Sequence, residues 1–345
     1  MLKSFNEKNS TSGCAIIVLK GFGGMGKTQL MLRYCYFRHK AYDFVFWLKA
    51  DSWVMVADSF RYLAINLGIE TTLLENDNAE ETIFSWVQCW LEENTNWLLL
   101  LDNVEEKVAE DIFDRLSRKG GDIIMTSREY IPPWKATIIE IGKMTEEEAL
   151  ALLLQKELGS IDRQDLHFQY VRKVISELDY MPLALDLARA YMEATTSTYQ
   201  GYLKRLQKYR KSIFSFHDKD IANKYSYSVE TVWAISLKRI QNINPTAIKL
   251  LEACAFLYPD EISIQLFDHY HILLEADPNL NITETNELKD EDEREQVQTA
   301  ISILNKFSFI SLIPSKMNEK DTEKLFAAVK IHRLVQKVIY DAIER

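Results

Sequence analysis

Short apolar runs alternate with amphipathic stretches over the first 142 residues. Five runs predict strands: Ala15–Leu19, Phe44–Leu48, Trp97–Leu101, Ile123–Thr126 and Thr137–Ile141. Between them, apolar side chains such as Phe60, Leu63 and Leu67 recur at the three- and four-residue spacing that indicates helices. The run at 97–101 is apolar throughout, which is typical of a parallel strand covered on both faces. We therefore predict a doubly wound α/β domain with a parallel sheet over residues 13–142.

The pattern becomes purely helical after residue 142. Thr145 and Glu148 form a capping box ahead of an Ala- and Leu-rich helix. Further helical stripes continue to about Tyr209, and Pro182 stands where a helix would begin. These features predict an all-α domain over residues 143–215.

The last part, residues 216–345, predicts helices with one hairpin. Apolar runs at Phe309–Ile313 and Phe326–Ile331 flank a polar stretch, as in the wing of a winged helix, and Arg333–Ile343 forms a closing helix. Residues 281–295 are polar and acidic and predict a surface loop. At the other end, the polar residues 1–12 predict a flexible tail without the apolar stretch of a signal peptide.

Composition narrows the class of protein. The 345 residues are 47% hydrophobic, which excludes a disordered chain, and no apolar run has the length of a membrane span. The net charge of −10 argues against general affinity for nucleic acid, because phosphate contacts need a basic surface. The four cysteines lack disulfide or zinc spacing, so we expect reduced thiols and a cytoplasmic location.

The segment GFGGMGKT at residues 21–28 matches a phosphate-binding loop at every fixed position, between a predicted strand and a predicted helix. Its backbone N–H groups and the helix N-terminus would hold the phosphates of ATP or ADP, Lys27 would bridge them, and Thr28 would bind Mg²⁺. A chance glycine-rich turn is the alternative, and its flanking elements disfavour it. The predicted nucleotide-contacting residues here are Gly21, Gly23, Gly24, Met25, Gly26, Lys27, Thr28 and Gln29.

Two charged residues close predicted strands near this loop. Asp102 follows the apolar strand and would anchor Mg²⁺ beside the phosphate loop. The alternative, which would be favoured if no phosphate loop were present, is an ordinary aspartate in a turn after a buried strand. Arg128 ends the fourth strand, where it would face the ligand crevice and sense the γ-phosphate, with a solvated surface Arg as the alternative. Taken alone, Pro182 and His332 are more often structural than ligand-binding.

Five motifs occur in a familiar order: GFGGMGKT (21–28), LLLLDNV (98–104), DIIMTSR (122–128), MPLAL (181–185) and VKIHRLVQ (329–336). Together they resemble the NB-ARC domain of STAND-class P-loop NTPases, the group of the NOD-like receptors, and most of all its fungal members with tetratricopeptide repeats. The resemblance implies an α/β nucleotide-binding domain, a helical (ARC1-like) domain and a winged-helix (ARC2-like) domain. It also implies that Arg128 is a sensor, that Pro182 packs on adenine and that His332 binds the β-phosphate of ADP.

Three motifs depart from the family pattern. Asn103 stands where relatives often have a carboxylate that acts on the attacking water, so we expect slow hydrolysis. The family's M-H-D triplet, whose histidine corresponds to His332, here reads Ile331-His332-Arg333. Tyr180 replaces the glycine of the family's G-x-P motif, whose proline corresponds to Pro182.

These observations predict a signalling switch, closed with ADP and open with ATP, that self-associates in the ATP state. By resemblance it would act in innate immunity, cell death or non-self recognition, as at most a slow ATPase. The effector and sensor domains typical of the family have no counterpart in this sequence. The alternatives are a STAND-type transcription regulator that uses the winged helix on DNA, which the negative charge disfavours, and a P-loop small-molecule kinase.

Overall fold

The computed structural model describes residues 14–70, 78–106, 108–109, 112, 116, 119–128, 136–156, 167–214, 227–267, 287–314 and 326–343. The chain divides into two compact units, Met1–Gly142 and Lys143–Arg345. The predicted tail, residues 1–12, lies outside the described residues.

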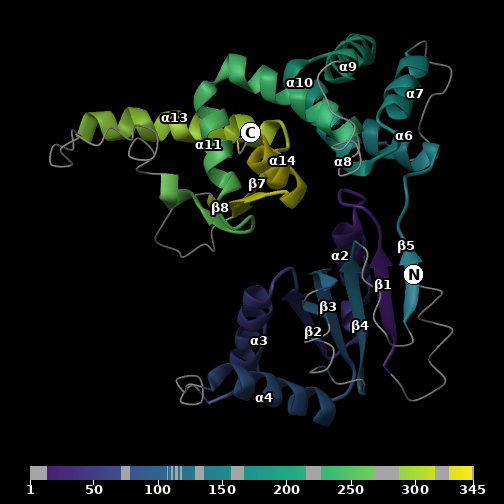
Figure 1. Cartoon of the computed structure of the whole chain (residues 1–345), viewed down its shortest axis with the longest axis vertical. Coiled ribbons are helices and arrows are strands. Elements are labelled where there is room, and N and C mark those ends of the chain that lie inside the picture. Colours follow the sequence, from purple (N-terminus) through teal and green to yellow (C-terminus); the bar gives the residue numbers. More distant parts are fainter. Residues whose placement is uncertain are drawn as a thin grey trace. The chain divides into compact units, whose positions relative to one another are not determined.

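The first unit is built on a five-stranded sheet with the order β2-β3-β4-β1-β5 (Figure 1). All neighbouring strands are parallel, which confirms the predicted α/β class. The strands are β1 (Ile16–Lys20), β2 (Phe44–Lys49), β3 (Trp97–Val104), β4 (Gly121–Ser127) and β5 (Thr137–Glu140). Because β1 lies between the central strand β4 and the edge strand β5, the loop that follows β1 emerges beside β4 at the carboxyl edge of the sheet.

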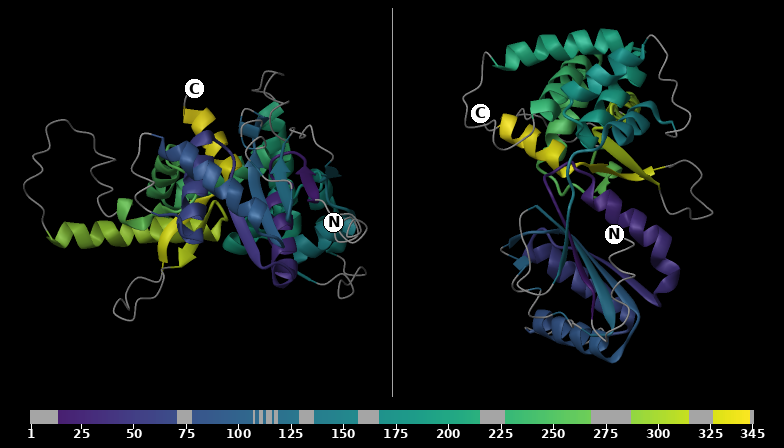
Figure 2. Two further views of the ribbon diagram at one scale, coloured as in Figure 1. Left: turned by 90° about the horizontal axis from the view of Figure 1, so that it is seen from below. Right: turned by 90° about the vertical axis from the view of Figure 1, so that its right-hand side faces the viewer.

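Helices cover both faces of this sheet, as the right-hand view of Figure 2 shows. On one face α2 (Lys27–Arg38) packs Met31 and Tyr34 against Leu98 and Leu100 of β3. A short 3-10 helix, η1 (His39–Ala41), follows it. On the other face α3 (Trp53–Leu67) and α4 (Ala79–Glu93) contribute the apolar stripes that pack on the remaining strand residues. The alternation of Leu98 to Leu101 between two cores explains why this strand is apolar throughout.

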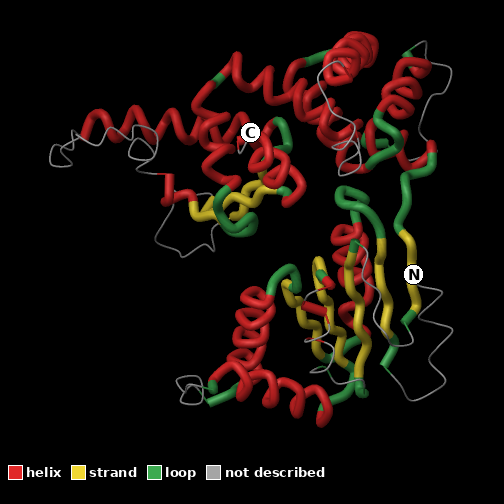
Figure 3. Tube along the Cα trace, in the orientation of Figure 1, coloured by secondary structure: helices red, strands yellow, loops and turns green. Residues whose placement is uncertain are grey.

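The second unit begins with helices (Figure 3). They are α6 (Glu146–Leu154), α7 (Phe168–Glu177), α8 (Pro182–Thr195), α9 (Tyr199–Phe214), α10 (Tyr227–Ile243) and α11 (Pro245–Ala255). The predicted capping box is present at the start of α6, where Thr145 and Glu148 exchange side-chain-to-backbone hydrogen bonds. Pro182 is the first residue of α8, where a missing N–H costs nothing.

A small antiparallel sheet follows, with the order β6-β8-β7. Its strands are β6 (Ile262–Ser263), β7 (Ile310–Pro314) and β8 (Phe326–Ile331), with the 3-10 helix η4 (Ile264–Phe267) after β6. The helices around it are α13 (Glu287–Lys306) and α14 (Arg333–Ile343). Strands β7 and β8 pair as the predicted hairpin does, whereas the two-residue strand β6 is too short to leave a periodic signal.

One prediction in this unit is wrong. Residues 281–295 were expected to form an acidic loop, but α13 begins at Glu287. The segment ELKDEDEREQ is rich in Glu, Lys and Arg, which are strong helix formers whose long side chains lose little freedom in a helix. Residues 281–286 lie outside the described residues. Within the described ranges, no helix combines the length and apolar character needed to span a membrane.

Candidate functional site

The segment between β1 and α2 has the geometry of a phosphate-binding loop. Gly21 leaves the sheet with its N–H bonded to the Ser127 carbonyl at 3.2 Å, and a Cβ at this position would collide with the carbonyl oxygen of Ile141. Gly26 adopts the left-handed conformation (φ 81°) directly before α2, and no described side chain caps the first turn of this helix. Its first N–H groups therefore remain available for an anion at the positive end of the helix dipole.

Lys27 reaches back over this loop. Its Nζ donates hydrogen bonds to the carbonyl oxygens of Gly21 at 2.7 Å and Phe22 at 2.8 Å. Burial and, second, the positive charge of Arg128 lower the pKa of Lys27 to about 8, although the negative charge of Asp102 acts in the opposite direction. The structure thus brings Lys27, Asp102 and Arg128 together at one edge of the sheet, as the sequence predicts.

Thr28 and Asp102 are also brought together. The Thr28 hydroxyl donates to Asp102 Oδ1 at 2.8 Å, although 74 residues separate the two in the sequence. A hydroxyl and a carboxylate are hard oxygen ligands, and Mg²⁺ bound with a nucleotide takes few ligands from the protein because phosphates and water supply the rest. Among the described residues no cluster of three or more His, Cys, Asp or Glu could hold a metal. The oxygens of Thr28 and Asp102 suit a Mg²⁺ ion that arrives with a nucleotide. Bound there, the ion would neutralise charge on the phosphates.

Sequence reasoning missed Thr126. Its hydroxyl donates to the same Asp102 oxygen at 2.7 Å and accepts the backbone N–H of Asn103, also at 2.7 Å. Asn103 itself adopts a left-handed conformation with φ 60° at the end of β3. The only sequence signal was a threonine two positions before Arg128, which is common in strands.

The remaining predicted residues of the loop lie in the first unit as expected. Met25 is 8% exposed and anchors the loop, whereas Gln29 faces outward from α2. Gly23 and Gly24 form the turn that precedes Met25, and Arg128 is exposed just after β4.

Pro182 and His332 belong to the second unit, so their contact with a nucleotide stays a prediction. The turn before Pro182 contains one of the family departures. Tyr180 there has φ 57°, a left-handed conformation in which glycine is the least strained residue.

His332 has a structural role that the structure makes visible. It lies between β8 and α14, and its Nδ1 accepts the N–H of Leu334 at 3.1 Å, which caps the helix. An acceptor Nδ1 carries no proton, so in the neutral ring Nε2 holds the proton and is the donor. The neighbouring Arg333 donates to Asp260 Oδ2 at 3.1 Å and to the Tyr258 hydroxyl at 3.0 Å.

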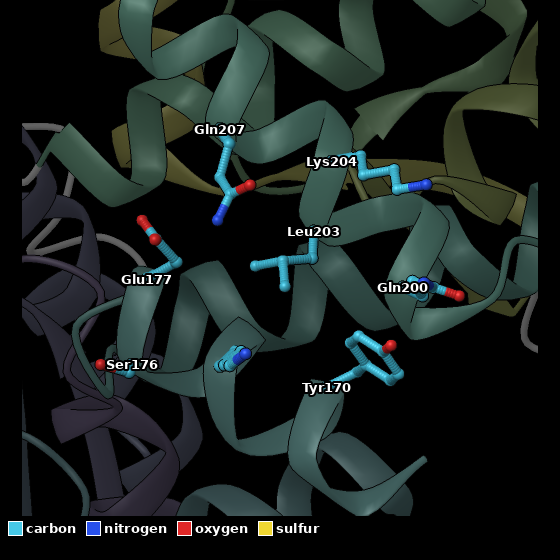
Figure 4. A pocket seen from close by; sticks show the side chains of 8 residues that line it. Tyr170, Ser176, Glu177, Gln200, Leu203, Lys204 and Gln207 are labelled. Carbon is cyan, nitrogen blue, oxygen red and sulfur yellow. The ribbon is translucent and has the colours of Figure 1, made fainter. Parts of the chain in front are cut away.

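The second unit also contains a hollow of about 440 Å³ between α7 and α9 (Figure 4). Leu203 lies at its centre, and Glu177, Gln207 and Lys204 stand around it. None of the predicted site residues lines it, and its polar, mixed-charge rim assigns no ligand class.

A comparison with protein families matches the part of the chain that contains the phosphate loop. Residues 1–159 match the NB-ARC domain, so this part of the chain is an NB-ARC domain of the P-loop NTPase type, which confirms the predicted resemblance there. The match does not distinguish the fungal branch. Residues 238–345 match a domain of unknown function (DUF7779).

No curated protein was found to match the chain. One solved structure that matches is the Aeropyrum pernix ORC1 protein in complex with DNA. The sequences are 12% identical, and the alignment covers 95% of this chain and 86% of the other. Its TM-score is 0.32, which is too low to support an argument about the fold or about DNA.

Proposed function

We propose that this NB-ARC protein is a nucleotide-dependent switch, closed around ADP and open with ATP. The observation that carries the proposal is the phosphate loop at the carboxyl edge of the sheet, with Thr28 already hydrogen-bonded to Asp102. A P-loop with its lysine, its hydroxyl and a strand-end aspartate holds a nucleotide and Mg²⁺ in one place.

A switch needs a group that contacts the nucleotide in one state only. A ligand shifts a conformational equilibrium only as far as its affinity differs between the two states. We assign that role to the second unit, read as a helical domain over 143–215 and a winged-helix domain over 216–345. The hairpin of β7 and β8 between α13 and α14 supports the second assignment. In the closed state Pro182 would pack on adenine, and His332 would donate from Nε2 to the β-phosphate.

The chemistry of the site supports slow turnover. Hydrolysis needs a group that orients or deprotonates the attacking water, and the amide of Asn103 can orient water but cannot accept its proton at neutral pH. A long-lived ATP state suits self-association and signalling. By family resemblance the process is innate immunity, cell death or non-self recognition in the cytoplasm.

The direct test is to identify the nucleotide released by heat from purified protein. We expect a stoichiometric amount of ADP in the wild type and none in Lys27→Ala, because the phosphates lose their charge partner. Lys40→Ala removes an exposed lysine after α2 and should retain ADP. Wild-type protein that is free of nucleotide and binds none when it is added would contradict the proposal.

A further inference from the structure

Strands β3 and β4 lose their regular pairing beside the nucleotide site. The parallel register runs from Trp97 opposite Gly121 to Leu101 opposite Met125, and then jumps to Val104 opposite Ser127. Asp102 and Asn103 together therefore face the single residue Thr126, which is a β-bulge. The bulge sends Val104 back into the core beneath α3 and α4.

The Thr126 side chain is what joins the two sides of this bulge. It is 1% exposed, and its hydroxyl uses its one donor and one of its two acceptor lone pairs in this site. It accepts the N–H of Asn103, which the bulge removes from the strand ladder, and it donates to Asp102 Oδ1. Because Thr28 donates to the same oxygen at 2.8 Å, hydroxyls from the phosphate loop and from β4 both orient this carboxylate.

We propose that the Thr126 hydroxyl is a positioning group of the nucleotide site, which aims the Asp102 carboxylate at Mg²⁺ and fixes the backbone of Asn103. This inference rests on the proposed nucleotide-binding function. A single hydroxyl thereby links the Mg²⁺ anchor to the residue that faces the attacking water. It lies near the end of β4, two positions before Arg128, which follows the strand.

A role in positioning differs in its consequences from a role in packing alone. Groups that orient a metal ligand change metal affinity by about 10–100-fold when they are removed. Loss of packing would instead weaken nucleotide binding with and without Mg²⁺ alike. The distinguishing quantity is therefore the Mg²⁺ concentration that gives half-maximal binding of a non-hydrolysable ATP analogue.

The experiment titrates Mg²⁺ against binding of the fluorescently labelled analogue in wild type, Thr126→Val and Thr126→Ser. In excess EDTA all three should bind with the same affinity. We expect Thr126→Val to need about tenfold more Mg²⁺ and Thr126→Ser, which keeps the hydroxyl, to follow the wild type. Thr231→Val, at a 4% exposed threonine of α10 in the other unit, is the matched control and should not change.

Other results of this titration would contradict either the positioning role of Thr126 or the proposed function. A Thr126→Val variant with the wild-type Mg²⁺ response, or one that loses affinity equally in EDTA, overturns the positioning role. If Thr126→Val fails to fold, as judged by its thermal unfolding, Thr126→Ala replaces it in the same titration. Wild-type protein that binds no nucleotide at all would instead contradict the proposed function.

Discussion

Because the pKa of Lys27 is depressed, we predict that nucleotide affinity decreases as the pH rises from 7 to 9. Burial, and then the charge of Arg128, lower this pKa to about 8, well below the ordinary value of 10.5. About nine-tenths of the free protein therefore carries the charge that attracts phosphate at pH 7, and this charge is lost as the pH rises through 8. At pH 9 about a tenth of the free protein keeps the charge, so ADP should bind about tenfold more weakly than at pH 7.

Nucleotide phosphates do not complicate this range, because their last proton is lost near pH 6–7. The assay is fluorescence anisotropy of a labelled ADP at constant ionic strength from pH 7 to 9.5. In Arg128→Gln the second cause of the shift is removed, so the midpoint of the decline should move to higher pH even if overall affinity drops. Lys40→Gln, which changes an exposed lysine, should leave the midpoint in place.

Two results would refute this reasoning. An affinity that stays constant to pH 9.5 would mean either that the Lys27 charge persists or that it contributes nothing to binding. A midpoint that is the same in Arg128→Gln and wild type would mean that the two cations do not interact in the folded protein.

Three further predictions test the other assigned residues. His332→Ala removes both the helix cap and the Nε2–H donor, whereas His332→Asn can still cap. If Nε2 binds ADP, stopped-flow release should speed up several-fold in both variants, and acceleration in the alanine variant alone would mean that the residue only caps α14. Asn103→Asp should raise single-turnover ATP hydrolysis, because a carboxylate can accept the proton of water and aspartate also tolerates the left-handed backbone; an unchanged rate would show that another group positions the water. Asp260→Ala should lower the free energy of unfolding in urea by about 1–3 kcal/mol, since the partly buried Arg333 loses its carboxylate partner. Lys143→Ala, in the exposed pair with Asp179, should cost less than about 1 kcal/mol, and equal losses would refute the assignment.

Several features of the protein follow from local sequence alone. The strand–loop–helix pattern around Gly21–Thr28, the apolar run that ends at Asp102 and the capping box at Thr145 each depend on neighbouring residues. Periodicity, turn chemistry and capping act over one or two turns of chain, so a single sequence displays them directly. The same local reasoning is wrong at residues 287–295, because their charge predicts a loop although many of them are strong helix formers.

Other features depended on the tertiary structure. The bond from Thr126 to Asp102 joins residues 24 apart, and the one from Arg333 to Asp260 joins residues 73 apart. Neither has a periodic signal, because such pairs are set by strand order, by the bulge in β3 and by packing between distant elements. The phosphate-loop motif predicts which residues would surround the phosphates of a nucleotide. Only the folded sheet decides which hydroxyl holds the carboxylate, because hydrogen bonds form between neighbours in space and not between neighbours in sequence.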